Sequence, residues 1–516
     1  MAKVNLDAII PREDFEVDNV TSTGKKKETI SIEDIKSDSF FFTTVRKPDF
    51  QRETTEWDSK KISNFIQSFL DGDLIPAIIL WRSASGYLFI IDGSHRLSAL
   101  AAWINNDFGD GEISKMFYDG IIPEDQIEIA EETRKLVRSE VGSYSDYKLA
   151  LTNPEKVLPN LLIRAKNLAA LAIQLQWVEG DAAKAEQSFF KINQQAAPID
   201  KTELVLLESR NKPNCIAARA IIRGGKGHKY WSIFSEENQK QIQNLAKEIH
   251  EILFNPTLQT PIKTLDLPVG GKSYSAQTLP LILDFINIVN EIPHNTFKDK
   301  LEDDSTGEKT IEILRKMRKL VYKINSIHAS SFGLHPVVYF YSKEGRHKVA
   351  SFYAIAALIM DFDENMSNKF IKIREKFEEI LLVYDDLVQQ INRKKRSALA
   401  SYTSIKEYYL ELINRLDDNK LIEAVIKEVM ALGSFNYLML NETKNNIPTS
   451  KFSSDTKSAV FIKDTLSTAP RCKICNGYIH KNSITIDHIV RKQDGGNSSV
   501  DNGQITHPYC NTTVKN

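Results

Sequence analysis

The feature that most constrains this chain is a set of metal-ligand residues near its C-terminal end. Four cysteines occur in 516 residues, and three of them lie in this tail. Cys472 and Cys475 form a Cys-x-x-Cys pair, and His507 and Cys510 form a His-x-x-Cys pair further along. Two such pairs, each on a tight turn, have the spacing of a four-ligand zinc site. The tail is therefore predicted to be a small domain held together by structural Zn²⁺.

An acidic residue and a histidine lie between the two pairs, where a structural zinc site does not need them. Asp487 and His488 belong to an apolar segment, Ile484–Val490, which alternates like a strand and is followed by the turn-forming Gly495-Gly496. Alternation places the two side chains on opposite faces unless the strand ends there. One of them could then ligate a metal while the other reaches a phosphate. The tail is also locally basic, which favours a polyanion as partner.

With these residues in place, the tail at 471–516 resembles the HNH nucleases, whose ββα-metal fold clamps one divalent ion. The resemblance implies that His488 is the general base that activates water, and that Asp487 and Asn511 ligate a catalytic Mg²⁺ or Mn²⁺. It also implies that Asn502 braces the loop carrying the histidine. Amide oxygen suits a hard cation better than Zn²⁺, so two different metals are expected. The implied activity is cleavage of DNA phosphodiester bonds.

A second cluster of polar residues follows an apolar, β-rich run near the N-terminus. Asp92-Gly93 ends this run, and Ser94-His95-Arg96 opens a segment with helical periodicity. The start of a helix exposes backbone N–H groups and the positive end of the helix dipole, to which these side chains add donors. This pattern predicts an anion site at the strand–helix junction. The alternative is a plain turn at Asp92-Gly93 with Ser94 as an ordinary N-cap.

Three blocks in this region occur in a recognisable order, namely Phe50-Gln51-Arg52, then Asp92–Arg96, then Phe189–Asn193. They resemble the N-terminal domain of GmrSD-type modification-dependent restriction enzymes, a ParB/sulfiredoxin-like domain. The family has two glutamines where this chain has serine and histidine, and sulfiredoxins have a cysteine where the serine stands, so redox chemistry is not expected. The resemblance implies binding of a phosphate, or of a nucleotide such as ATP or GTP, that licenses the tail to cut. The implied binding residues are Arg52, Asp92, Gly93, Ser94, His95, Arg96 and Asn193.

Periodicity and composition indicate an α+β multidomain protein. A hairpin is predicted at Ala77–Trp81 and Tyr87–Ile91, and a helix at Asp58–Leu70 with Asp58 as its N-cap. Lys369–Ile391 shows helical periodicity with abundant lysine and glutamate. The predicted parts are residues 1–208 (ParB/sulfiredoxin-like α/β sensor domain), 209–440 (mainly helical connector), 441–470 (linker with one short structured piece) and 471–516 (HNH module).

Other features of the sequence narrow the class of protein. No apolar run reaches the length of a membrane span and no signal pattern opens the chain, so a cytoplasmic protein without a membrane partner is expected. Clustered cysteines favour metal ligation over disulfides, and Cys215 is expected to be a small buried residue. The preferred interpretation is a metal-dependent HNH endonuclease acting on modified or phage DNA in restriction or anti-phage defence. The alternatives are a repair, recombination or homing nuclease, and a zinc-containing DNA-binding regulator without cleavage; whether the protein forms a homo-oligomer stays open.

Overall fold

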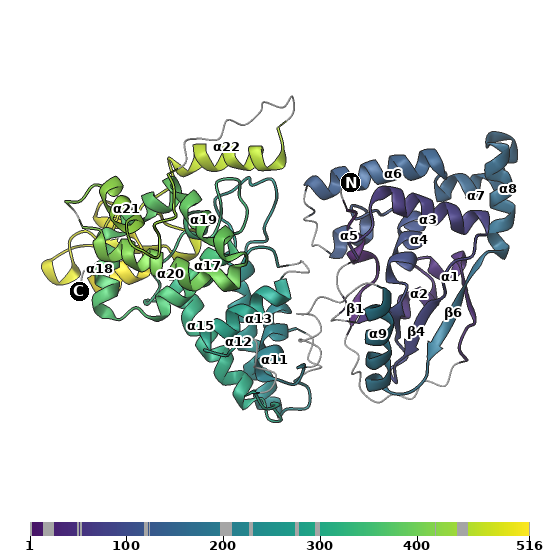
Figure 1. Cartoon of the computed structure of the whole chain (residues 1–516), viewed down its shortest axis with the longest axis horizontal. Coiled ribbons are helices and arrows are strands. Elements are labelled where there is room, and N and C mark those ends of the chain that lie inside the picture. Colours follow the sequence, from purple (N-terminus) through teal and green to yellow (C-terminus); the bar gives the residue numbers. More distant parts are fainter. Residues whose placement is uncertain are drawn as a thin grey trace. The chain divides into compact units, whose positions relative to one another are not determined.

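The chain folds as two compact units, one ending at Glu208 and one beginning at Ser209. The first unit contains a sheet with helices and the second is mainly helical, which confirms the predicted α+β class (Figure 1). The computed structural model describes residues 3–13, 25–48, 51, 54–117, 122, 124–196, 209–226, 231–273, 278–294, 300–417, 419–440 and 452–514.

A six-stranded mixed sheet forms the centre of the first unit, with the strand order β1-β3-β5-β4-β6-β2. Strands β4 and β5 pair antiparallel, which confirms the predicted hairpin, whereas β1, β3 and β5 are parallel neighbours. Because β3 and β5 are parallel, they end at the same edge of the sheet, and the residues that follow them can form one site. The strands are β1 (Arg12–Glu13), β2 (Thr29–Ser31), β3 (Val45–Pro48), β4 (Ile78–Arg82), β5 (Leu88–Asp92) and β6 (Ala172–Val178).

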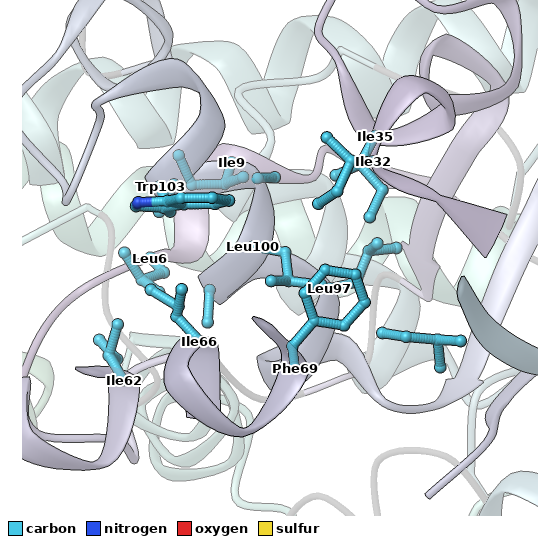
Figure 2. Packing of buried hydrophobic residues seen from close by; sticks show 14 of the residues in the cluster. Leu6, Ile9, Ile32, Ile35, Ile62, Ile66, Phe69, Leu97, Leu100 and Trp103 are labelled. Carbon is cyan, nitrogen blue, oxygen red and sulfur yellow. The ribbon is translucent and has the colours of Figure 1, made fainter. Parts of the chain in front are cut away.

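Helices cover both faces of this sheet. Leu88 and Ile90 of β5 belong to the larger apolar core, and Figure 2 shows side chains of α3 and α4 in this core, such as Phe69 and Leu100. Phe89 and Ile91 face the other side, where they pack with Phe189 of α9. Alternation thus makes β5 apolar on both faces, as expected for a strand in the middle of a covered sheet. The main helices are α3 (Ser59–Asp71), α4 (Ser94–Asn105), α6 (Glu124–Glu140), α7 (Tyr144–Thr152), α8 (Pro159–Asn167) and α9 (Ala182–Ala196).

Helix α3 begins where its sequence predicts. The Asp58 carboxylate accepts a hydrogen bond from the backbone N–H of Lys61 at 2.8 Å, so it acts as the N-cap. Ile62, Ile66 and Phe69 are buried along one side of the helix. The capped start and the apolar stripe together fix α3 against the sheet.

The second unit is a set of packed helices that ends in a small β-hairpin. Cys215 is fully buried in its first helix, as predicted. Helix α22 (Ser454–Leu466) occupies part of the predicted linker at 441–470. None of the described helices combines the length and apolar character of a membrane span. The elements are α11 (Pro213–Ile222), α12 (Glu236–Phe254), α13 (Thr278–Val289), α15 (Glu308–Ile324), α16 (Pro336–Tyr339), α17 (Val349–Met360), α18 (Glu364–Val383), α19 (Asp385–Lys395), α20 (Ala398–Arg415), α21 (Ile422–Met430), α22 (Ser454–Leu466), β7 (Thr485–His488), β8 (Gly503–Thr506) and the one-turn helix η7 (Cys510–Val514).

The segment Lys369–Ile391 is helical, as its periodicity indicates, but it is divided between two helices: α18 ends at Val383 and α19 begins at Asp385. The intervening Tyr384 leaves helical geometry, with ψ at 29°. Asp385 is buried and forms an ion pair with Lys348 at 2.6 Å. A carboxylate in the first turn also stabilises a helix N-terminus. Helical periodicity runs through the break, whereas the ion-pair partner lies on another element and is invisible to periodicity.

The Cys/His tail packs directly on the helical part of this unit. The backbone N–H of Tyr509 donates to the carbonyl of Ser331 at 3.0 Å. The hydroxyl of Ser483 donates to the carbonyl of Ser326 at 2.8 Å. The segment that follows α15 therefore forms part of the support for the hairpin.

Candidate functional site

The four predicted zinc ligands lie together in the structure. Cys472 and Cys475 come from the turn that precedes the hairpin, and His507 and Cys510 follow β8. Their ligand atoms lie within 4.8 Å of one another, and all four residues are buried. A tetrahedron of metal–sulfur bonds of about 2.3 Å places its ligands about 3.8 Å apart. The cluster therefore has the donor set, the compactness and the burial of a structural zinc site.

The three thiols of this cluster are joined by hydrogen bonds, which raise the pKa of Cys475 to about 12 and that of Cys510 well above its usual range. Hydrogen bonds from Cys475 and Cys510 lower the pKa of the Cys472 thiol. Burial lowers the pKa of His507, which keeps its imidazole neutral. Nε2 of His507 lies 3.0 Å from the carbonyl of Tyr478, while Nδ1 lies 3.3 Å from the sulfur of Cys475. The contact of Nε2 with a backbone carbonyl occupies that nitrogen and identifies Nδ1 as the ligating nitrogen.

A buried arginine from the helical part reaches this cluster. Nη1 of Arg374 on α18 lies 3.2 Å from Nδ1 of His507. Nε of Arg374 donates to Glu378 at 2.7 Å, and neither side chain has any exposed surface. Burial lowers the pKa of Arg374, but Glu378 and the nearby cysteines outweigh it, so its pKa lies well above the usual value. The guanidinium therefore stays charged. The sequence does not indicate that Arg374 is buried, because α18 has the composition of a surface helix.

The two residues that resemble the reacting centre lie at the end of β7. Asp487 pairs with Gln504 of β8, and His488 pairs with Gly503. Asp487 is buried, and its Oδ2 accepts a hydrogen bond from the Gln504 amide at 2.8 Å. His488 is half-buried, with Nε2 at 3.4 Å from the hydroxyl of Ser498. Asp487 and His488 are the last two residues of β7 and lie at one end of the hairpin.

Asn502 closes the loop that follows His488. Its Oδ1 accepts a hydrogen bond from the N–H of Val490 at 2.7 Å, and its Nδ2 donates to the Val490 carbonyl at 3.0 Å. Nδ2 also donates to the carbonyl of Asn497 at 2.7 Å. One amide side chain thus holds both ends of this loop.

Asn511 lies beside the same strand. It follows Cys510 in the one-turn helix, and its Nδ2 is 3.4 Å from the carbonyl of Ile486. This contact fixes the orientation of the amide and leaves Oδ1 as its acceptor atom. The structure therefore brings Asn511 next to the strand that carries Asp487 and His488.

The predicted N-terminal anion site lies where β5 runs into α4. Gly93 joins the two elements with φ at +103°, in the left-handed region. A Cβ at this position would lie 3.0 Å from Cγ1 of Ile78, so glycine is favoured for space as well as for its backbone conformation. The alternative of Ser94 as N-cap is wrong, because Gly93 takes that position and Ser94 is the first helical residue. The Ser94 hydroxyl instead accepts a hydrogen bond from Gln51 at 3.2 Å.

Two of the other predicted residues pair with each other. Nη2 of Arg96 donates to Asp92 at 2.7 Å and to the carbonyl of Ala77 at 3.0 Å. His95 stacks on Trp57, with ring centroids 5.7 Å apart. The structure thus brings Asp92, Ser94, His95 and Arg96 together around the start of α4. Arg52 and the side chain of Asn193 lie outside the described residues.

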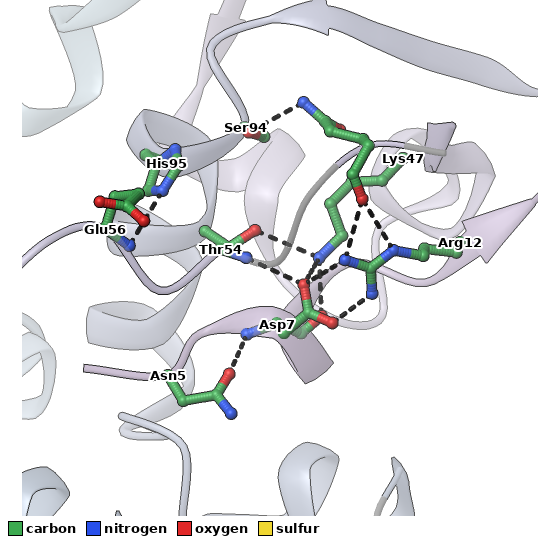
Figure 3. A network of polar contacts seen from close by, with 9 residues as sticks. Asn5, Asp7, Arg12, Lys47, Thr54, Glu56, Ser94 and His95 are labelled. Carbon is green, nitrogen blue, oxygen red and sulfur yellow. Dashed lines mark hydrogen bonds and ion pairs between the residues drawn. The ribbon is translucent and has the colours of Figure 1, made fainter. Parts of the chain in front are cut away.

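A buried ion cluster at this edge of the sheet was not anticipated from the sequence. Nζ of Lys47 lies 2.7 Å from Oδ1 of Asp7, and Arg12 Nη2 donates to the same oxygen at 2.8 Å (Figure 3). Burial raises the pKa of Asp7, but Lys47 and Arg12 outweigh it, so this pKa lies well below the usual range. A lysine in the short strand Val45–Pro48 is a weak signal in the sequence. Nothing in the sequence links Lys47 to an aspartate 40 positions earlier.

Both ends of the chain match known families. Residues 31–208 match the GmrSD restriction endonuclease, N-terminal domain, and residues 472–516 match the HNH endonuclease family. No curated protein and no solved structure matches the chain. The two domain matches thus indicate a restriction-type nuclease whose substrate class is DNA. More particularly, the chain joins a GmrSD restriction endonuclease N-terminal domain to a C-terminal HNH endonuclease domain, which confirms both resemblances.

Proposed function

We propose that this protein is a metal-dependent endonuclease of phage defence that cuts DNA at the β7–β8 hairpin and is gated by its N-terminal domain. The observation that carries the proposal is the grouping at the end of β7. Asp487 and His488 are adjacent on the strand, Asn511 lies beside it, and Asn502 closes the following loop. This supports a reacting centre that is separate from the Cys/His cluster.

The donor set supports two different metals. Asp487 and Asn511 offer carboxylate and amide oxygens, which suit Mg²⁺ or Mn²⁺. A divalent ion at this place would offset negative charge on the phosphate as the bond breaks. The three thiolates and the imidazole of the other cluster suit Zn²⁺.

In the proposed reaction, His488 accepts a proton from the water that attacks the phosphorus. Imidazole suits this role because it gains and loses a proton near neutral pH. The Gln504 amide holds the carboxylate of Asp487 through Oδ2, and Asn502 holds the loop after the histidine. These contacts fix the reacting groups before substrate binds, which is where much of the rate gain in such a site originates.

The N-terminal site supports gating by a phosphate-bearing ligand. The backbone N–H groups at the start of α4 point out of a helix N-terminus, which attracts anions. Nε of Arg96 and Oε1 of Gln51 are buried and have no hydrogen-bond partner among the described residues. Such atoms fit a site that is completed by a polar ligand. We infer that a nucleotide such as ATP or GTP, or the backbone of modified DNA, completes it.

One experiment tests both parts of this proposal. Purified full-length protein is incubated with modified and unmodified DNA, with Mg²⁺ or Mn²⁺, and with or without ATP or GTP. We expect metal-dependent cutting that differs between the two DNAs and responds to a nucleotide. Equal cutting in all metal-containing conditions would refute the gating. DNA binding without cutting under any condition would favour the non-catalytic regulator. A phage plating assay on cells that carry the gene separates a defence role, which lowers plaque formation, from repair or homing.

A further inference from the structure

Arg374 has an environment that an ordinary helix-stabilising ion pair would not require. The guanidinium is fully buried and directs Nη1 toward His507 and the carbonyl of Phe332, and Nη2 toward the carbonyl of Gly333 at 3.1 Å. Glu378, one turn along α18, binds only the Nε side. The end of the guanidinium that carries Nη1 therefore faces the Cys/His cluster.

The charge of a zinc site explains this arrangement. Zn²⁺ with three thiolates and a neutral imidazole carries a net charge of −1 by simple addition. A buried charge is costly unless a counter-charge lies close to it. Within the cluster, Sγ of Cys475 lies 3.3 Å from Nδ1 of His507, and Nη1 of Arg374 lies 3.2 Å from the same nitrogen. The guanidinium also interacts electrostatically with Cys475 and Cys510, so it lies where it offsets the thiolate charge.

Contacts around the pair fix this placement. Glu378 Oε2 accepts a hydrogen bond from the backbone N–H of Tyr478 at 2.8 Å, and Oε1 accepts one from the Tyr339 hydroxyl at 2.9 Å. A Cβ on Gly477 would overlap Nε of Arg374, so the backbone of the metal-binding turn lies directly against the guanidinium. Outer-shell partners of this kind orient ligands and tune metal affinity.

We propose that Arg374 is a positioning residue of the zinc site: it supplies the counter-charge of the three thiolates and couples zinc retention to helix α18. The inference rests on zinc as the metal of the Cys/His cluster and does not depend on nuclease activity. It makes the helical connector a part of the metal site, with Glu378 holding the arginine in position.

The test measures zinc retention in the purified full-length protein. Zinc per chain is determined by atomic emission, and the rate of zinc release to a chromogenic chelator is compared among variants. Arg374→Gln removes the charge but keeps a donor, and Arg374→Lys keeps the charge. We expect Arg374→Gln to release zinc about 10- to 100-fold faster than wild type, and Arg374→Lys to recover most of the retention. The control is Arg415→Gln, which breaks a partly exposed i,i+4 ion pair with Glu411 on α20 and should not change release.

Folding is controlled separately, because Arg374→Gln leaves Glu378 buried without its partner. The double variant Arg374→Gln/Glu378→Gln removes both charges, and we expect it to fold and still release zinc faster than wild type. The proposal would be overturned if the double variant released zinc at the wild-type rate. It would also be overturned if Arg374→Lys and Arg374→Gln released zinc at equal rates. Wild-type protein that holds no zinc after purification with zinc present would overturn the zinc assignment and this inference with it, while cleavage assays would still report on the nuclease.

Discussion

The side chain of Asn502 forms two hydrogen bonds with the backbone of Val490, one to its N–H and one to its carbonyl. Replacing Asn502 with alanine removes both, together with the bond to Asn497, and should weaken the loop by about 1–3 kcal/mol. We expect the turnover number for plasmid nicking to fall about 10- to 100-fold, since misplaced catalytic groups act slowly. Hydrogen exchange of residues 490–496 should rise while zinc content stays constant. Wild-type turnover with a loosened loop would show that the brace is not needed for catalysis.

Removing the imidazole of His488 should stop cleavage without unfolding the tail. His488→Ala is expected to lower the nicking rate about 100- to 10,000-fold, the range that general bases contribute. Zinc content and the melting temperature should match wild type, because the residue lies outside the zinc cluster. His294→Ala, in the same unit, is the matched control and should cut normally. Substantial cutting by His488→Ala would refute the assignment of the general base.

Loss of one zinc ligand should destabilise the second unit. Cys510→Ser is expected to lower the zinc content and to reduce the melting temperature by at least about 5 °C, because metal binding contributes directly to folding. Cys215→Ala is the control: this cysteine is fully buried, and burial raises its pKa to about 12. The control should keep its zinc. A stable Cys510→Ser variant with full zinc content would show that another residue can serve as the fourth ligand.

His480 should make the stability of the second unit depend on pH in the acidic range. Burial lowers its pKa from 6.5 to about 4, while Asp266 raises it and Lys481 lowers it. Nδ1 lies 3.3 Å from Oδ1 of Asn325, and the ring of His335 packs against the His480 ring. The unfolded chain therefore binds the proton first as pH falls below 6.5. About 3 kcal/mol of stability should be lost between pH 6.5 and 4.

The measurement for His480 is the denaturant midpoint of wild type and His480→Gln at pH 7.5 and pH 4.5. Other groups titrate in the same range, so the difference between the two proteins is the quantity that matters. The variant should lose less stability on acidification than wild type. Identical losses in both proteins would refute the contribution of His480.

The buried ion pair between Asp7 and Lys47 should stabilise the first unit only as a pair. Asp7→Asn leaves Lys47 without its full counter-charge and should cost about 3 kcal/mol near neutral pH. Asp7→Asn/Lys47→Met should recover most of this loss. Because the pKa of Asp7 is lowered, the contribution is present above its unfolded pKa and is lost at strongly acidic pH. Denaturant unfolding measures both variants, and additive losses in the double variant would contradict the coupling.

The parts of this molecule that the sequence predicts well depend on short-range patterns. The Cys-x-x-Cys and His-x-x-Cys pairs place four ligands because each pair is fixed by its own turn. The β4–β5 hairpin and the start of α3 at Asp58 follow from alternation and from a local cap. In each case the residues of one ligand pair, one cap or one hairpin lie close together in the sequence, so the pattern is visible along the chain.

The parts that escape prediction depend on partners far along the chain. In the sequence, Arg374 is one of many charged residues in a lysine- and glutamate-rich helix. Only the fold shows that Tyr478 and His507 lie beside it. The break at Tyr384 is likewise followed by a distant contact, since Asp385 pairs with Lys348, the residue before α17. Periodicity records which side of a helix is apolar, but it does not record which buried charge another element will neutralise.

The close fit of Gly477 against Arg374 has a consequence for protein engineering. A chimaera that transplants only residues 471–516 onto another sensor would carry the metal ligands but would leave behind α18 and the loop after α15. The graft would expose the backbone that now covers the guanidinium, and would lose the acceptor for the Tyr478 amide. The smallest exchangeable unit is therefore the nuclease hairpin together with its helical support, and functional recombination between relatives should occur at boundaries outside both.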